Sequence, residues 1–193
     1  MQLIFATNNP NKAREIAAIL PQVIEVKTLK ETGIDIDIPE PHDTFKDNAL
    51  EKSRTIFNLT HLNCFSEDSG LEVDALNGLP GVRSARFAGE PADDEKNIEK
   101  LLDDMKGKPN RSARFRTVVS LIWNETEYFF EGVCEGEIID KKTGDNGFGY
   151  DPVFIPDGSD KTFAEMTLEE KNLFSHRKKA VNQLIEFLKN KVQ

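Results

Sequence analysis

The start of the chain limits the fold most, because it reads as a buried strand, a tight loop and a helix in direct succession. Residues 3–6 (LIFA) are apolar throughout, which fits a short buried strand. Residues 7–11 (TNNPN) are rich in turn formers, and an amphipathic helical pattern begins near Asn11. A strand that leads through a tight loop into a helix is the opening of an α/β fold.

Strand and helix patterns continue to alternate along the chain. Further strands are expected at residues 23–29, 64–66, 114–123, 128–139 and 153–155. Further helices are expected from Asp43 or Thr44 to about Leu59, at 93–105 and from Ser175 onward. Thr167 and Glu170 have capping-box spacing, which predicts a short helix or turn there. The last helix is expected to pack through an apolar stripe formed by Ala180, Val181, Leu184, Ile185 and Leu188. The last two long β-rich runs predict an antiparallel hairpin, so the sheet is expected to be mixed. A length of 193 residues suits one domain, and we expect residues 1–193 to form a single α/β domain with an elongated mixed β-sheet flanked by helices.

The chain is acidic, with a formal net charge of −9. Such a chain repels a phosphate backbone at long range, so nucleic-acid polymers are not expected as partners, although a local cluster of Lys and Arg can still bind a small phosphorylated ligand. No stretch approaches the roughly 20 apolar residues that span a bilayer, and the N-terminus lacks a signal-peptide pattern, so no membrane partner is expected. Cys64 and Cys134 form no CxxC pair and read as reduced, partly buried thiols, which fits the cytoplasm.

Residues 7–12 (TNNPNK) have the features of a phosphate-binding loop. The start of the following helix offers free N–H groups and the positive end of the helix dipole. Side-chain amides and Lys12 add further donors. The segment is not a Walker A loop, which requires Gly-x-x-x-x-Gly-Lys-Ser/Thr. An Asn-rich turn with a solvated lysine is the alternative.

Residues 67–70 (EDSG) set two carboxylates side by side where the third strand is expected to end. Mg²⁺ is typically held by one or two carboxylates together with substrate phosphates. Glu67 and Asp68 are therefore candidate ligands, with Glu40 on the loop at 33–43 as a third carboxylate. A plain Asp-Ser-Gly turn is the alternative.

Two later segments have the features of a nucleotide pocket. In residues 147–152 (GFGYDP), two glycines let the backbone approach a flat ligand and an aromatic ring can stack on a base, although a buried hairpin corner would look similar. Lys171, His176 and Arg177 bring donors to a predicted helix start. A cation there is slightly unfavourable to the helix dipole, which favours a ligand-binding role over a simple helix start.

Together these segments resemble the inosine triphosphate pyrophosphatases, a family of noncanonical purine nucleoside-triphosphate pyrophosphatases. The motifs are ATNNPNK, EDSGLEVDALNGLPGVRSARFAG, GFGYDPVF, AEMTLEEKN and SHR, and the resemblance runs from Leu3 to Leu188. Many relatives have glycine after the threonine, where this chain has Asn8. Because asparagine tolerates left-handed backbone geometry, we expect the loop to keep its shape.

The resemblance implies hydrolysis of ITP, dITP and XTP to the nucleoside monophosphate and pyrophosphate, with Mg²⁺. It implies that Asp68 binds the metal and accepts the proton of the attacking water, with Glu40 as the second metal ligand and Glu67 assisting. An aspartate has an ordinary pKa near 4, so Asp68 is expected to be mostly ionised at neutral pH, which suits metal binding and orientation of water better than strong basicity. The implied substrate-binding residues are Thr7, Asn8, Asn9, Pro10, Asn11, Lys12, Lys52, Ser69, Phe148, Gly149, Tyr150, Asp151, Lys171, His176 and Arg177. It also implies two lobes with a central nucleotide cleft, and a homodimer.

The preference for the 6-oxo purines has a physical reason. Donors aimed at the 6-position, such as Arg177 or His176, would favour an oxo acceptor over the amino donor of adenine, because two facing donors leave a buried group unpaired at a cost of about 1–3 kcal/mol. Two alternatives stay open at this point. One is a Maf-type nucleotide pyrophosphatase with another base preference, and the other is a non-catalytic nucleotide sensor, which need not retain the carboxylates.

Overall fold

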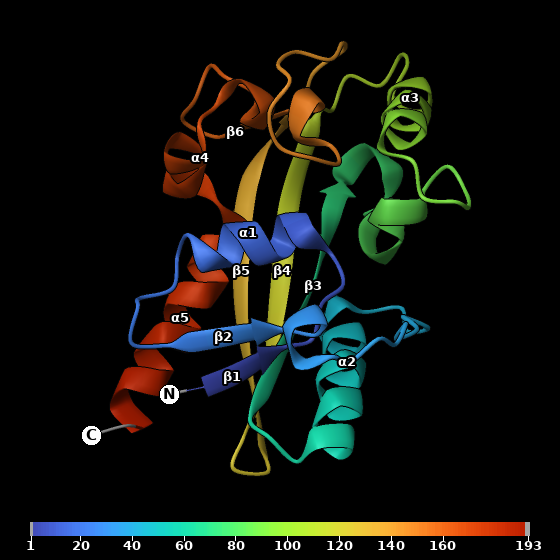
Figure 1. Ribbon diagram of the computed structural model, residues 1–193. Coiled ribbons are helices and arrows are strands. Elements are labelled where there is room, and N and C mark those ends of the chain that lie inside the picture. Colours follow the sequence, from blue (N-terminus) through green and yellow to red (C-terminus); the bar gives the residue numbers. More distant parts are fainter. Residues whose placement is uncertain (1, 192–193) are drawn as a thin grey trace. The chain divides into compact units, whose positions relative to one another are not determined.

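The computed structural model describes residues 2–191, which form an α/β fold around a mixed six-stranded sheet (Figure 1). The elements in chain order are β1 (Gln2–Phe5), α1 (Pro10–Ala17), β2 (Glu25–Thr28), α2 (Phe45–Thr60), β3 (Cys64–Val73), α3 (Asp94–Asp104), β4 (Ser112–Trp123), β5 (Thr126–Ile138), β6 (Phe154–Pro156), α4 (Leu168–Phe174) and α5 (His176–Lys191). The strand order is β2-β1-β3-β4-β5-β6. Strands β2 and β3 run parallel to β1, whereas β6 runs antiparallel to β5, so the predicted mixed sheet is confirmed.

The described chain divides into two compact units, each built from separate segments. Unit 1 comprises residues 2–68, 117–132 and 177–191, and unit 2 comprises residues 69–116 and 133–176. The long strands β3, β4 and β5 each contribute residues to both units.

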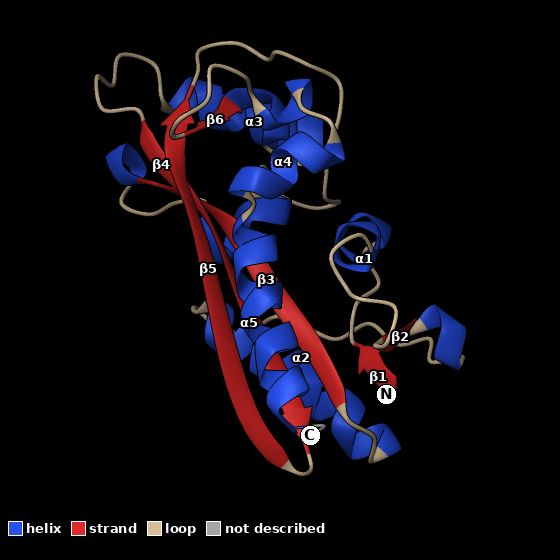
Figure 2. Ribbon diagram, turned by 90° about the vertical axis from the view of Figure 1, so that its left-hand side faces the viewer, coloured by secondary structure: helices blue, strands red, loops and turns tan. Residues whose placement is uncertain are grey.

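Unit 1 has a hydrophobic core on each face of its strands, because alternate strand residues point to opposite faces. Leu3 and Phe5 of β1 belong to one core cluster, and Ile4 and Ala6 belong to the other. The first cluster also contains Ile16 of α1 and the apolar residues predicted for the last helix, which are Ala180, Val181, Leu184, Ile185 and Leu188. The second contains Ile56 of α2. Helices α1 and α5 therefore cover one face and α2 covers the other, and Figure 2 shows α5 lying along the strands.

Unit 2 has a separate core. Its members are Leu71, Val73, Ile98, Leu101, Met105, Ala113, Phe115, Cys134, Ile138, Tyr150, Val153, Phe154, Phe163 and Met166. The ring of Phe115 packs edge-on against Phe154, with ring centroids 4.8 Å apart. This core supports the 147–152 segment, because Tyr150 anchors it from within.

Helix starts follow the capping residues that the sequence offers. Asn9 caps α1 by accepting from the backbone N–H groups of Asn11 and Lys12. Thr44 caps α2 and Asp93 caps α3, each accepting from the backbone N–H three residues later. The predicted capping box is confirmed, because Thr167 and Glu170 bond reciprocally at the start of α4.

The predicted end of the third strand is wrong. The sequence suggested a strand at residues 64–66 followed by a turn at 67–70, but β3 continues without interruption to Val73. The acidic residues Glu67 and Asp68 lie inside this strand, where they are 2% and 4% exposed. They are tolerated there because each has cationic partners, which replace the lost solvation.

The predicted hairpin is confirmed but has a tighter turn than residues 124–127. Strands β4 and β5 are adjacent and are joined by Asn124 and Glu125 alone, at φ angles of 48° and 64°. Two central residues with positive φ are typical of the type I′ turn, whose twist matches that of the flanking strands.

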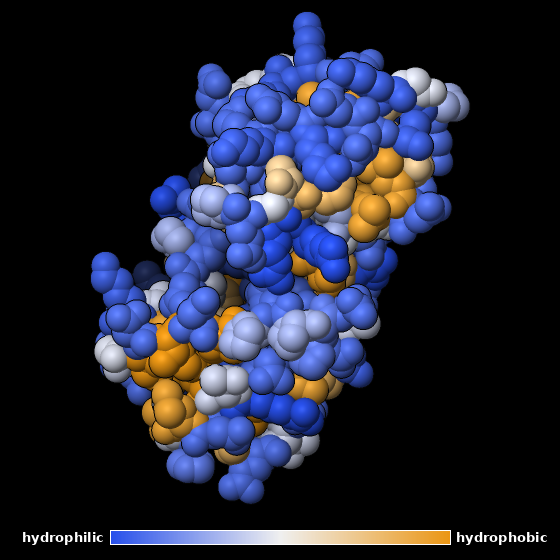
Figure 3. All heavy atoms as spheres, turned by 90° about the vertical axis from the view of Figure 1, so that its right-hand side faces the viewer, coloured by the Kyte–Doolittle hydropathy of each residue, from blue (hydrophilic) through white to orange (hydrophobic). Residues whose placement is uncertain are grey.

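The surface and the cysteines agree with the expectations from composition. Hydrophilic side chains cover most of the face in Figure 3, and hydrophobic side chains gather there in a few patches. Cys64 and Cys134 are both free and buried, and burial raises the pKa of the Cys64 thiol to about 12. Within residues 2–191, no helix has the length and apolar character needed to cross a membrane.

Candidate functional site

The topology of unit 1 creates a switch point at the carboxyl end of β1, beside the middle of β3. The chain leaves β1 through α1 to reach β2 on one side, and leaves β2 through α2 to reach β3 on the other side of β1. Since α1 and α2 cover opposite faces, the two connections diverge at this point. In open α/β sheets, ligands bind at such a switch point, outside the carboxyl ends of the strands.

Residues 7–12 lie at this position, between β1 and the first turn of α1. Three of their backbone N–H groups are used within the loop, which corrects the expectation that these groups are free. The N–H groups of Asn11 and Lys12 donate to Oδ1 of Asn9 at 2.9 and 3.2 Å, and the N–H of Asn9 donates to Oγ1 of Thr7 at 3.1 Å. The Asn8 side chain donates to the carbonyl of Ile36 at 2.8 Å, which ties this loop to residues 33–43. The loop is thus rigid, and the ammonium of Lys12 is its charged donor.

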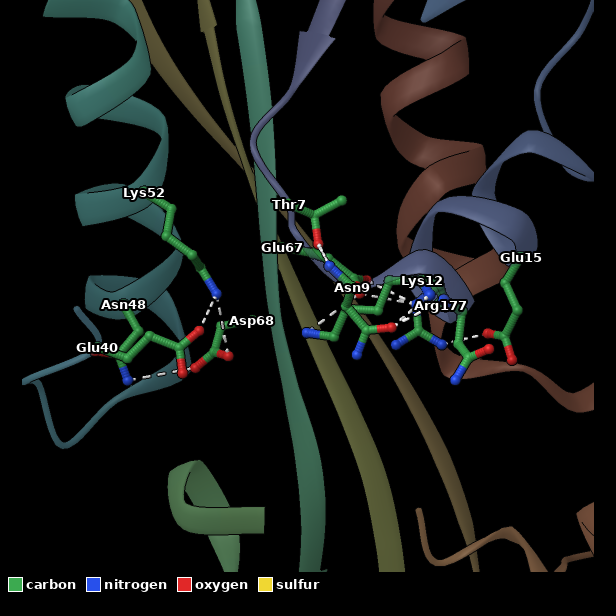
Figure 4. Close-up of polar contacts among 11 residues, drawn as sticks. Thr7, Asn9, Lys12, Glu15, Glu40, Asn48, Lys52, Glu67, Asp68 and Arg177 are labelled. Carbon is green, nitrogen blue, oxygen red and sulfur yellow. Dashed lines mark hydrogen bonds and ion pairs between the residues drawn. The ribbon is translucent and has the colours of Figure 1, made fainter. Parts of the chain in front are cut away.

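Glu67 faces α1 and α5, where it joins a buried network of charges (Figure 4). Nε of Arg177 donates to both carboxylate oxygens of Glu67, at 3.0 and 2.8 Å. Nη1 of Arg177 donates to Glu15 of α1, and Nζ of Lys12 lies 3.5 Å from Oε1 of Glu67. Burial alone would raise the pKa of Glu67, but Arg177 and Lys12 hold it below its ordinary value. Burial lowers the pKa of Lys12, and Glu67 offsets part of this effect.

Asp68, the next residue of β3, faces α2 and has different partners. Nζ of Lys52 lies 2.5 Å from Oε1 of Glu40 and 3.4 Å from Oδ1 of Asp68, so one ammonium bridges two carboxylates. Asn48, one turn before Lys52, donates to Oδ2 of Asp68 at 3.3 Å. The expectation that Asp68 has an ordinary pKa is wrong, because burial raises its pKa despite the opposing charges of Lys52 and Lys12.

The two adjacent carboxylates of β3 therefore belong to different groups on opposite faces of the strand. Figure 4 shows β3 between them, with Glu40, Asn48, Lys52 and Asp68 on one side and the network of Arg177 on the other. The prediction that Glu67 and Asp68 share one cation is corrected by this alternation, which is a property of every extended strand. The carboxylates that do converge are Glu40 and Asp68.

The donor set on the α2 side fits a magnesium ion that also binds substrate phosphate. Within the described residues, no group of three or more His, Cys, Asp or Glu side chains is arranged to hold a metal. Mg²⁺ needs only one or two carboxylates from the protein, because water and phosphate oxygens complete its coordination. Glu40 and Asp68, which share the ammonium of Lys52, supply two such carboxylates. Glu40 and Asp68 are the residues that could hold such an ion.

The 147–152 segment of unit 2 is organised by the carboxylate of Asp151. Its Oδ2 accepts from the backbone N–H of Phe148 at 2.9 Å and from Nζ of Lys171 at 2.6 Å. Gly147 is required beside it: its φ is +79°, and a Cβ there would lie 2.0 Å from Oδ2 of Asp151. The Lys171 ammonium also lies 5.3 Å from the ring centroid of Phe148. Next to it, the N–H of Gly149 donates to Asp94 at the start of α3, at 2.8 Å.

The remaining predicted pocket residues are more buried than the sequence suggested. The ring of Tyr150 lies in the unit 2 core, and its hydroxyl donates to the carbonyl of Ser84 at 2.8 Å. Its burial raises the pKa of this hydroxyl. The ring of His176 stacks on Phe115, with centroids 4.9 Å apart. Among the aromatic rings of the 147–152 segment, that of Phe148 is thus the more accessible for stacking on a base.

In unit 1 the structure places Lys12 and Arg177 with Glu67 on one side of β3, beside the loop of Thr7 and Asn9, and Glu40 and Lys52 with Asp68 on the other side. In unit 2 it brings Phe148, Asp151 and Lys171 together, next to Gly149. Ser69 directly follows Asp68 in β3. Three further residues were missed. Glu15 lies three positions after Lys12 on α1, a spacing that places two side chains on one helix face. Asn48 lies four positions before Lys52 on α2, but its contact with Asp68 exists only in the fold, as does the contact of Asp94 with Gly149.

Residues 3–187 match the Ham1 family. A dITP/XTP pyrophosphatase of Christiangramia forsetii is 48% identical over 97% of this chain and 99% of its own, and one of Bacillus subtilis is 44% identical over 97% and 96%. The structure of the Staphylococcus aureus Ham1 protein superposes with a TM-score of 0.90 at 41% identity, covering 99% of this chain and 100% of that one.

These matches extend over both compact units, and the solved Ham1 structures share the mixed sheet with its flanking helices. They favour the first of the three functional hypotheses over a Maf-type enzyme. A match of this length and identity shows that the chain belongs to the Ham1 family.

Proposed function

We propose that this protein hydrolyses the noncanonical purine nucleoside triphosphates dITP, ITP and XTP to the nucleoside monophosphate and pyrophosphate. The observation that carries the proposal is the convergence of Glu40 and Asp68 with Lys12 and Lys52 at the switch point of unit 1. Lys12 and Lys52 both interact electrostatically with Asp68, so cations and carboxylates act on one region. The names of the relatives, dITP/XTP pyrophosphatases at 43–50% identity, support the same reaction.

In this proposal, the residues of unit 1 have different roles in the attack of water at the α-phosphorus. Asp68, with its raised pKa, is a better proton acceptor than an ordinary aspartate and orients the attacking water. Lys12 and Lys52 stabilise the charge that grows on the departing pyrophosphate. A Mg²⁺ held by Glu40 and Asp68 would supply charge neutralisation of the phosphate oxygens.

Lys52 has a second task in this scheme. Its burial lowers its pKa, but Asp68 and Glu40 outweigh this effect and raise it, so Lys52 stays charged. The ammonium holds the two carboxylates together at 2.5 and 3.4 Å before a substrate arrives. Phosphate oxygens of a bound substrate would offer Lys52 alternative partners, so that Glu40 and Asp68 could hold the metal.

Recognition of the base falls to unit 2 in this proposal. The Lys171–Asp151 pair fixes Phe148 and the backbone of Gly149, so the segment offers a stacking ring and ordered polar groups. A donor aimed at the 6-position donates to the oxo group of hypoxanthine or xanthine but leaves the amino group of adenine unpaired, at a cost of about 1–3 kcal/mol.

The position of bond cleavage tests the reaction directly. The enzyme is incubated with dITP and Mg²⁺ in ¹⁸O-labelled water, and the products are analysed by mass spectrometry. Attack at the α-phosphorus yields labelled dIMP and unlabelled pyrophosphate. Labelled orthophosphate together with dIDP would contradict the proposal, because it would mean attack at the γ-phosphorus.

We also propose that the protein is a homodimer, as the family resemblance implies, and that it works in the cytoplasm, which its two free cysteines favour. Light scattering coupled to gel filtration should give twice the chain mass of 21.8 kDa. A peak at the mass of one chain at micromolar concentration would contradict the dimer. Cell fractionation tests the compartment, and recovery of the activity in a membrane or secreted fraction would contradict it.

A further inference from the structure

Asn48 of α2 uses its entire side-chain amide to join two parts of unit 1. It is fully buried, with 0% exposure. Its Oδ1 accepts from the backbone N–H of His42 at 2.9 Å, and its Nδ2 donates to the backbone carbonyl of the same residue at 3.0 Å. Nδ2 also donates to Oδ2 of Asp68 at 3.3 Å. The acceptor and both donor hydrogens of the amide are thus occupied.

These bonds matter because Glu40 lies on a loop without regular structure. Residues 34–44 form neither helix nor strand, and Glu40 is two residues before His42. The side chain of Asn48 bonds to both the N–H and the carbonyl of His42, and it thereby attaches this loop to α2. The third bond attaches the same amide to Asp68 of β3 (Figure 4). One side chain therefore fixes the loop of Glu40 against the strand of Asp68.

We propose that Asn48 is a positioning residue that sets the separation of Glu40 and Asp68 for binding of a divalent cation. This inference rests on the proposed function, because it concerns the same two carboxylates. Other residue types cannot do the same. Aspartate at this position would repel Asp68 and offer no donor, whereas an apolar residue would leave the backbone groups of His42 without partners.

The fold supplies a matched control in unit 2. Asn97 of α3 is also buried, at 2% exposure. Its Oδ1 accepts from the N–H of Ala88 at 2.7 Å, and its Nδ2 donates to the carbonyl of Ala85 at 2.9 Å. Asn97 thus fastens a loop to a helix as Asn48 does, but its amide bonds are to backbone groups alone. If Asn48 had only a structural role, replacing Asn48 or Asn97 would have similar consequences.

The test compares Asn48→Ala and Asn97→Ala in the full-length protein. Binding of Mn²⁺ alone is measured by electron paramagnetic resonance of the free ion, and the Mg²⁺ dependence of turnover is measured separately. Loss of a residue that orients metal ligands weakens metal affinity by about 10–100-fold. We expect Asn48→Ala to weaken Mn²⁺ binding and raise the half-saturating Mg²⁺ by this factor, with kcat largely recovered at high Mg²⁺. Asn97→Ala should keep the wild-type values of both.

A third measurement reads the loop itself. Hydrogen exchange of a peptide covering residues 36–44 should be faster in Asn48→Ala than in wild type, because the His42 amide loses its acceptor. Should alanine prevent folding, Asn48→Ser takes its place with the same expectations, since a hydroxyl cannot reach His42 and Asp68 at once.

Wild-type Mn²⁺ affinity in folded Asn48→Ala would overturn the inference, as would an equal loss in Asn97→Ala. The outcome is separable from that of the proposed function. If wild type released no pyrophosphate from dITP, the proposed function would fail, while Mn²⁺ binding and hydrogen exchange would still test the role of Asn48.

Discussion

At the scale of single residues, two neighbouring acids of β3 have opposite surroundings. Glu67 is held by Arg177 and Lys12 and keeps its pKa below the ordinary value, whereas burial raises the pKa of Asp68. The difference arises from strand alternation, which turns the two side chains to different helices. Glu67 thus belongs to the framework of unit 1, and the raised pKa of Asp68 suits the proton-accepting role proposed for it.

Asp68→Asn is expected to abolish turnover and leave the fold intact. The amide keeps the shape of the side chain but loses the charge that binds metal and accepts a proton. Steady-state kinetics with dITP should show a loss of kcat of at least about 100-fold, the lower range for removal of a general base. Glu72→Gln, on the same strand but paired with Arg116, serves as the control and should keep its activity. Near-normal kcat in folded Asp68→Asn would mean that another group activates the water.

Arg177→Met is expected to lower the free energy of unfolding by about 3–5 kcal/mol, because it leaves buried carboxylates without their cation. Arg177 is 1% exposed and contacts Glu15 and Glu67. The control is Arg54→Met, since Arg54 forms an exposed pair with Glu127. Loss of that pair should cost about 1 kcal/mol or less. Urea unfolding measures both, and equal costs would show that the buried network contributes nothing beyond a surface ion pair.

At the scale of elements, helix α4 begins with a capping box whose charge is pH-dependent. Glu170 accepts from the N–H of Thr167 and from the ammonium of Lys161, and these bonds lower the pKa of Glu170 to about 2. A carboxyl whose pKa is lower in the folded state stabilises the fold above its unfolded pKa of 4.5. The stabilisation is lost as the pH falls through about 2.

Glu170→Gln isolates this charge, because glutamine can still complete a capping box. Thermal melts should show wild type above the variant at pH 7, with a difference that shrinks steadily as the pH falls from 4.5 towards 2. A difference that is independent of pH would contradict the assignment, and it would mean that the lost bonds rather than the charge stabilise the helix.

The elements show which parts of this fold are predictable from sequence. Helices α2, α3 and α4 start where Thr44, Asp93 and Thr167 supply caps, because capping is a local interaction. The continuation of β3 through Glu67 and Asp68 was not predictable, since the cations that permit buried acids come from distant segments. For the same reason, the contact of Asn48 with Asp68 and that of Asp151 with Lys171 are visible only in the fold.

At the scale of the whole molecule, the residues proposed for the reaction and those proposed for base recognition lie in different units. Unit 1 contains the carboxylates and lysines suited to metal and triphosphate, at the switch point between β1 and β3. Unit 2 contains the segment of Phe148 and Asp151, which is suited to a base. Rate and base preference therefore have to be measured on the full chain, which contains both units.

Release of pyrophosphate from a panel of triphosphates tests this central claim most directly. ITP, XTP, ATP and GTP are compared at equal concentration with Mg²⁺, and kcat/KM is determined for each. We predict rapid release from ITP and XTP and rates at least about 10-fold lower from ATP, as expected for one unpaired buried donor. Release from GTP should also be slower than from ITP. No release from ITP and XTP, or equal rates on all four, would contradict the account.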